Sequence, residues 1–146
     1  MEPPELTNFG SLIRFALELE AETSAFYAAA SGTLRPGPSA KLAQDLAAQH
    51  ESRRVLVERT RQQKLNEMVL EPITGLDGAR YRFDASVGTW EELPRKAIAL
   101  EEIAGLFYAE SSVVAKSLLT EAARTFRKLA DENVRNVAAL RETFQE

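Results

Sequence analysis

The residues best suited to chemistry are two glutamates that each precede a tyrosine at the same distance. Glu20 lies seven residues before Tyr27, Glu101 lies seven before Tyr108, and the pair recurs after 81 residues. Seven residues span about two helical turns, which places each tyrosine on the same face as its glutamate. The neighbouring residues on that face are apolar, and an unpaired buried carboxylate is costly. The repeat therefore predicts a charged centre that is balanced by a metal ion or by a buried ion pair.

The composition of the chain excludes several other kinds of site. Its 146 residues include no cysteine and a single histidine, His50, so disulfides, thiol nucleophiles and cysteine-ligated metals are ruled out. The formal charge of −4 argues against a nucleic-acid partner, because such surfaces are usually basic. No apolar run approaches the ~20 residues of a membrane span, and the acidic N-terminus lacks the features of a signal peptide. We therefore expect no membrane partner and a cytoplasmic location.

The elements that must position the two glutamates are helices. Apolar residues recur at helical spacing in four long segments, and breakers separate these segments. The expected helices cover residues 7–31, 39–69, 91–117 and 119–144, within a single domain of residues 1–146. This pattern predicts an all-α fold, a four-helix bundle made of two antiparallel helical hairpins.

The segment between the second and third expected helices, residues 70–90, has no helical period. A connection this long inside a compact domain is uncommon and needs a topological reason. The reason we expect is a crossover that runs the length of the bundle, so that the second and third helices lie parallel. A short extended piece is expected at Arg80–Phe83. The apolar residues expected to anchor the crossover are Ile73, Leu76, Tyr81, Phe83 and Trp90.

With these features, the chain resembles the ferritin-like superfamily, nearest its rubrerythrin-like branch. The resemblance is carried by the repeated Glu/Tyr pairs, by the string Ala-x-Glu-x-Glu that precedes Phe-Tyr, and by the crossover sequence Leu-Glu-Pro-Ile-Thr-Gly-Leu. In that branch the second and fourth helices each carry Glu-x-x-His, and four glutamates with two histidines hold two iron or manganese ions. The resemblance implies a ferritin-like bundle that forms a homodimer. An oxidoreductase of this kind would need a separate redox partner.

The sequence contains no Glu-x-x-His, and two registers remain open for the missing ligands. A constant offset of 81 residues pairs Glu51 and Arg54 in the second helix with Glu132 and Arg135 in the fourth. This register restores four glutamates but places arginine at both histidine positions. Arginine carries a permanent positive charge and offers no lone pair, so it cannot ligate a metal.

The second register uses an offset of 83 residues and is favoured for the fourth helix. It places His50 and Arg53 in the second helix opposite Asn133 and Asn136 in the fourth. Both asparagines then lie on the apolar seam of their helix. In the second helix the choice stays open, because His50 and Glu51 are adjacent and both positions lie near the centre.

Either register predicts a degenerate di-metal site. Residues that would hold a remaining metal are Glu20, Glu101, His50 and Glu51. A polar network that replaces the metal would draw on Arg53, Arg54, Asn133, Asn136, Tyr27 and Tyr108. The preferred hypothesis is a non-catalytic binding or structural module without a bound cofactor. The alternative is a mono-metal or di-metal oxidoreductase or iron-handling protein that uses iron or manganese. Whether the chain is an enzyme stays open.

Overall fold

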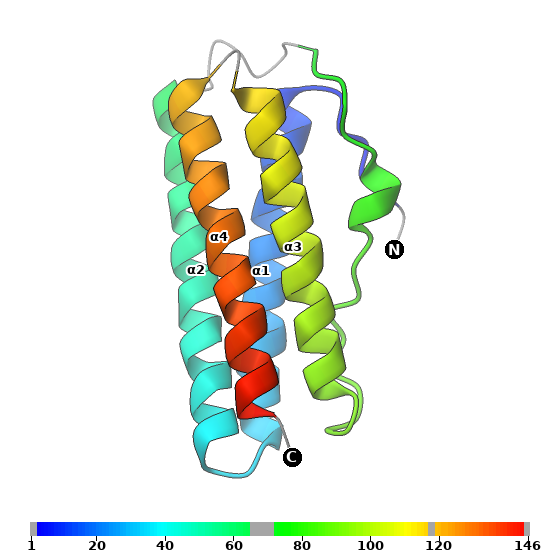
Figure 1. Cartoon of the computed structure of the whole chain (residues 1–146), viewed down its shortest axis with the longest axis vertical. Coiled ribbons are helices and arrows are strands. Elements are labelled where there is room, and N and C mark those ends of the chain that lie inside the picture. Colours follow the sequence, from blue (N-terminus) through cyan, green and yellow to red (C-terminus); the bar gives the residue numbers. More distant parts are fainter. Residues whose placement is uncertain (1–2, 65–71, 117–118, 145–146) are drawn as a thin grey trace.

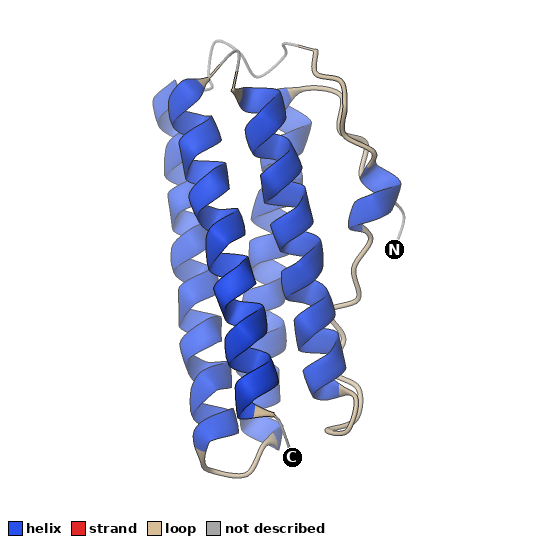
Figure 2. Ribbon diagram, viewed as in Figure 1, coloured by secondary structure: helices blue, strands red, loops and turns tan. Residues whose placement is uncertain are grey.

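The protein is an antiparallel bundle of four long helices, shown in Figure 1. The computed structural model describes residues 3–64, 72–116 and 119–144. The helices are α1 (Phe9–Thr33), α2 (Pro38–Lys64), α3 (Leu93–Ala115) and α4 (Thr120–Thr143), with a short 3₁₀ helix, η1 (Gly78–Tyr81), before α3. Figure 2 shows helices and loops but no strand in the described part of the chain. The expectation of an all-α four-helix bundle is confirmed.

The chain order and the crossover determine which helices are neighbours. α1 and α2 form one hairpin and α3 and α4 form the other, and residues 72–92 run along the bundle before α3 begins (Figure 1). α2 and α3 therefore run parallel, as expected. α1 contacts both α2 and α3, and α4 contacts both α3 and α2. All four of these neighbouring pairs are antiparallel, which brings the middle of every helix to one level.

The helix boundaries follow from local capping and differ slightly from the expected ones. Asn8 is the N-cap of α1: its side chain accepts a hydrogen bond from the Ser11 amide, and the Ser11 hydroxyl accepts one from the Asn8 amide. This capping box satisfies two otherwise unpaired backbone donors. In α3, Pro94 occupies the first turn, where its missing N–H leaves no backbone acceptor unpaired. The predicted end of the second helix at residue 69 lies outside the described residues.

The crossover is held against the bundle at its start and by an aromatic cluster. The Ile73 amide donates to the Thr7 carbonyl at 3.0 Å, which pairs the crossover with the segment before α1. The ring of Tyr81 lies edge-on to Phe107 of α3, and Phe15 of α1 contacts both Phe107 and Phe83. The contacts of Phe107 with Tyr81 and Phe15 are edge-to-face, a favoured arrangement of aromatic pairs, and the rings attach the crossover to α1 and α3.

Two expectations for the crossover are wrong. Trp90 does not anchor it, because 69% of this side chain is exposed. The extended piece expected at Arg80–Phe83 is wrong in its first half: Arg80 and Tyr81 belong to η1, and Arg82, which follows, is extended. The Asp77 side chain accepts a hydrogen bond from the Ala79 amide, and its carbonyl accepts one from the Arg80 amide, so the chain turns here.

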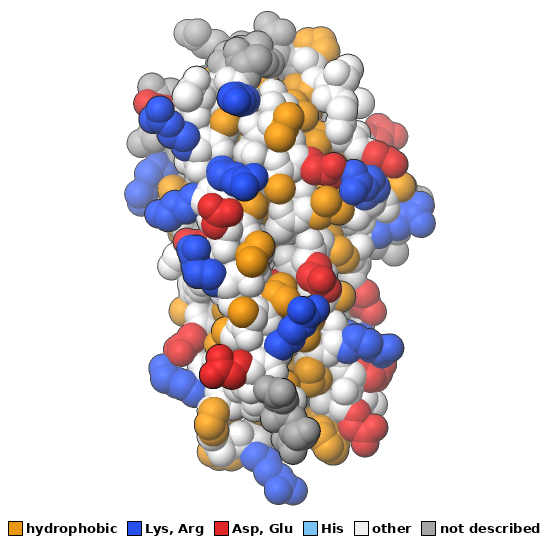
Figure 3. All heavy atoms as spheres, in the orientation of Figure 1, with side chains coloured by type: hydrophobic (Ala, Val, Ile, Leu, Met, Phe, Trp, Pro, Cys, Tyr) orange, Lys and Arg blue, Asp and Glu red, His pale blue; other side chains and the backbone are white. Residues whose placement is uncertain are grey.

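The face of the bundle that α3 and α4 form mixes charges of both signs. Figure 3 shows basic and acidic side chains interspersed with small apolar areas along α3 and α4, without a large patch of one kind. Among the described helices, none combines the length and the apolar character that crossing a bilayer requires.

Candidate functional site

The two repeated glutamates lie on either side of His50 in the interior of the bundle, and neither is exposed to solvent. Each accepts a hydrogen bond from the tyrosine of the other repeat. The Tyr108 hydroxyl donates to Glu20 Oε2 at 2.6 Å, and the Tyr27 hydroxyl donates to Glu101 Oε2 at 2.7 Å. This exchange is possible because α1 and α3 are antiparallel, so that each tyrosine, two turns from its own glutamate, lies level with the other one.

His50 of α2 bridges the two carboxylates. Its Nδ1 lies 2.5 Å from Glu20 Oε1, its Nε2 lies 2.7 Å from Glu101 Oε2, and the ring is stacked on Tyr27. Both ring nitrogens donate to carboxylate oxygens only when the imidazole carries both protons. Burial by itself lowers the pKa of His50, but Glu101 and then Glu20 outweigh it and raise this pKa to about 9. The ring is therefore a buried imidazolium at neutral pH.

Arg53, one helical turn after His50, provides the second buried cation. Its Nη2 lies 3.1 Å from Glu20 Oε2, and its Nε lies 3.2 Å from both carboxylate oxygens of Glu20. The same guanidinium donates to Asn133 Oδ1 at 2.9 Å and to the Leu129 carbonyl at 3.2 Å in α4. It also lies over the Tyr108 ring, 5.3 Å from the centroid, within the range of a cation–π contact.

α4 contributes amides to the second carboxylate. Asn133 Nδ2 donates to Glu101 Oε1 at 2.7 Å, and Asn136 Nδ2 donates to the same oxygen at 3.0 Å. Asn136 also pairs with Gln49 of α2, whose Oε1 accepts from Asn136 Nδ2 at 2.6 Å. Sequence reasoning missed Gln49, because a half-buried glutamine beside the seam of a helix carries no distinctive signal.

These residues form one neutral assembly, which we call the central cluster. Its members are Glu20, Tyr27, His50, Arg53, Glu101, Tyr108, Asn133 and Asn136. Two carboxylates are balanced by one imidazolium and one guanidinium. Burial by itself raises the pKa of both glutamates. For Glu20 this effect is outweighed by Arg53 and then by His50, and the pKa is lowered. For Glu101 it is outweighed by His50 and by the hydrogen bonds from Asn136 and Tyr27, and the pKa falls to about 2. Both carboxylates are therefore ionised, and each of their four oxygens already accepts hydrogen bonds.

The structure places Glu51 and Arg54 outside the central cluster, which corrects their inclusion among the candidate site residues. Arg54 Nη2 pairs with Glu51 Oε1 at 2.7 Å, and their side chains are 37% and 51% exposed. One residue along a helix rotates the side chain by about 100°, so these two point outward where His50 and Arg53 point inward. In α4, Arg135 is likewise exposed, and Glu132 lies at the edge of the cluster, 3.4 Å from Arg53 Nη1.

The central cluster does not fit a di-metal centre. Glu20 and Glu101 lie on opposite nitrogens of His50, so the three side chains do not converge on one point. Within the described residues, no group of three or more histidine, aspartate or glutamate side chains is arranged to hold a metal ion. A guanidinium next to Glu20 would repel a second cation and offers it no lone pair.

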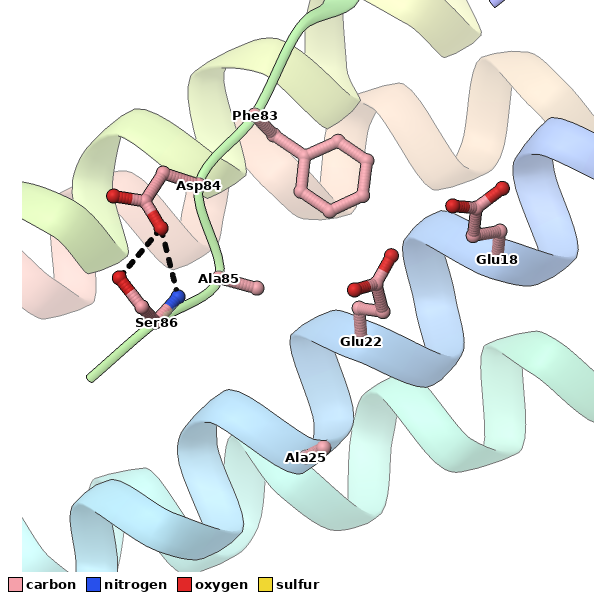
Figure 4. A pocket seen from close by; sticks show the side chains of 7 residues that line it. All are labelled: Glu18, Glu22, Ala25, Phe83, Asp84, Ala85 and Ser86. Carbon is pink, nitrogen blue, oxygen red and sulfur yellow. Dashed lines mark hydrogen bonds between the residues drawn. The ribbon is translucent and has the colours of Figure 1, made fainter. Parts of the chain in front are cut away.

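A separate hollow of about 530 Å³ lies on the surface between α1 and the crossover. Figure 4 shows Glu18 and Glu22 on α1 on one side of it and Phe83 and Asp84 of the crossover on the other. Asp84 already accepts two hydrogen bonds from Ser86: the Ser86 amide donates to Asp84 Oδ1 at 2.9 Å, and the Ser86 hydroxyl donates to the same oxygen at 2.6 Å. The hollow shares no residue with the central cluster.

Comparison of the chain with protein-family models, with characterised proteins and with solved structures found no match.

Proposed function

We propose that this chain is a ferritin-like protein of the rubrerythrin-like kind in which side chains replace the metal ions, and that it acts as a non-catalytic binding or structural module. The observation that carries the proposal is the position of His50, which donates to both core glutamates through its two ring nitrogens. A di-metal protein of this class would use those carboxylates as ligands. Here they are fully occupied by cations and donors of the protein itself.

The donor set supports the same proposal in more detail. Where the family pattern requires Glu-x-x-His on two helices, α2 carries His50 and Arg53 and α4 carries Asn133 and Asn136. Both cations come from α2 and both amides from α4, so the cluster ties the two hairpins together. Such a buried network adds little net stability, but removing one member leaves an uncompensated charge. This predicts that the loss of any charged member of the cluster destabilises the bundle.

The test is metal content, measured by elemental analysis after the purified protein has been incubated with Fe²⁺ or Mn²⁺ and desalted. We expect no stoichiometric metal. The positive control is a variant that restores Glu-x-x-His on both helices, and we expect it to retain metal. It combines the substitutions His50→Glu, Arg53→His, Asn133→Glu and Asn136→His.

One or two metal ions per unmodified chain would contradict the proposal. That result would favour the alternative, an iron or manganese oxidoreductase or iron-handling protein with a separate redox partner. Peroxide-reducing or ferroxidase activity that disappears in Glu101→Ala, while the helical circular dichroism signal persists, would establish the alternative. A homodimer and a cytoplasmic location belong to the proposal as well, and light scattering of the purified chain tests the first.

A further inference from the structure

The guanidinium of Arg53 lies in a cage of five oxygen atoms from two hairpins. Glu20 supplies both carboxylate oxygens from α1. The other three oxygens come from α4: the Leu129 carbonyl, Glu132 Oε1 and Asn133 Oδ1. The nitrogen–oxygen distances are 2.9 to 3.4 Å. These are ordinary hydrogen-bond distances for N–H donors.

The cage also has an aromatic wall. The Tyr108 ring lies under the guanidinium carbon at 5.3 Å. Oxygen acceptors around the edge and an aromatic ring on one face together match a planar, delocalised cation with several N–H donors.

Contacts that do not involve Arg53 hold the cage walls in place. Glu20 is fixed by the Tyr108 hydroxyl and by His50 Nδ1. The amide of Asn133 donates to Glu101 Oε1, which turns its Oδ1 toward the cage. The Leu129 carbonyl is part of α4. Four of the five oxygens and the Tyr108 ring are thus positioned before a cation enters, and such preorganisation favours binding.

We infer that this cage is a binding site for planar cations of the guanidinium and amidinium class, and that Arg53 is its built-in occupant. The inference rests on the proposed function in one respect, because both require that a side chain and not a metal balances Glu20. When the side chain of residue 53 is shortened, the cage takes a free guanidinium or acetamidinium ion from solution.

The experiment is chemical rescue of Arg53→Ala. The thermal midpoint of this variant is measured against guanidinium chloride up to about 20 mM, far below denaturing levels, with equal NaCl and tetramethylammonium chloride as controls. We expect a saturable rise with guanidinium and acetamidinium only. At ten times the dissociation constant, the ratio of folded to unfolded protein rises about eleven-fold. The unmodified chain and Arg54→Ala, which lacks the neighbouring exposed arginine, show no such rise.

The inference would be overturned if guanidinium and sodium shifted the thermal midpoint of Arg53→Ala equally. It would also be overturned if guanidinium shifted the midpoints of Arg53→Ala and Arg54→Ala equally. If Arg53→Ala is unfolded on its own, the same titration is read as recovery of the helical circular dichroism signal, and no recovery with guanidinium also overturns it. Rescue by Mn²⁺ or Fe²⁺ but not by guanidinium would assign the cage to metal ions. Metal in the unmodified chain contradicts the proposed function, whereas a failed rescue contradicts only the cage.

Discussion

The protonation of His50 makes a prediction about stability at alkaline pH. The pKa of this residue is raised from 6.5 to about 9 in the folded protein, because Glu101 and Glu20 outweigh the effect of burial. Between these two pH values the folded chain holds a proton that the unfolded chain has lost, so stability falls as pH rises. At about 1.4 kcal/mol per pH unit, the loss from pH 6.5 to 9 is about 3 kcal/mol. The contribution is fully present below pH 6.5.

The assay is urea unfolding, followed by circular dichroism at pH values from 6 to 10. His50→Gln is the matched control: it keeps a donor at this position but cannot titrate, so we expect it to be less stable at pH 6 and nearly independent of pH up to 9. His50 is the only histidine of the chain, so its ring ¹⁵N resonances need no assignment and should report two protonated nitrogens at pH 8. A flat profile for the unmodified chain, or an equal slope in the control, would refute the reasoning.

Three further predictions concern single side chains. Arg53→Ala removes one of the two cations that balance Glu20 and should cost about 3–5 kcal/mol, a fall in the thermal midpoint of roughly 6–20 °C. Arg54→Ala at the exposed neighbouring position should leave the midpoint nearly unchanged. Tyr27→Phe and Tyr108→Phe each remove one donor from a buried carboxylate and should each cost about 1–3 kcal/mol in urea unfolding; a large difference between them would contradict the reciprocal pairing. The Ser111 hydroxyl is buried without a hydrogen-bond partner among the described residues, so Ser111→Ala should raise stability by about 1 kcal/mol, and a loss would show that the hydroxyl has a partner.

The sequence was sufficient for the architecture because helical periodicity and chain breakers are local signals. The four segments of apolar period became α1 to α4, and the long aperiodic segment became a crossover that makes α2 and α3 parallel. The Glu/Tyr repeat also identified Glu20 and Glu101 as buried. Trp90 was misassigned, because an aromatic residue in a loop gives no indication of which way its side chain points.

The register of α4 could be predicted and that of α2 could not. In α4 the neighbours of Asn133 and Asn136 on the seam are apolar, so periodicity alone places both asparagines inward. In α2, His50 and Glu51 are adjacent polar residues near the seam, and a rotation of about 100° decides between them. Packing of α2 against α1 and α4 turned His50 inward and left Glu51 to pair with Arg54 at the surface.

The sequence by itself determined that two carboxylates lie in the middle of a duplicated helical hairpin and that ordinary di-metal ligands are missing. Only the tertiary structure decided what balances those carboxylates: the imidazolium of His50 between them and the guanidinium of Arg53 beside Glu20. The physical reason is that charge balance in a bundle core depends on contacts between helices. The partners in these contacts are 30 to 88 residues apart in the chain, and no local pattern records them.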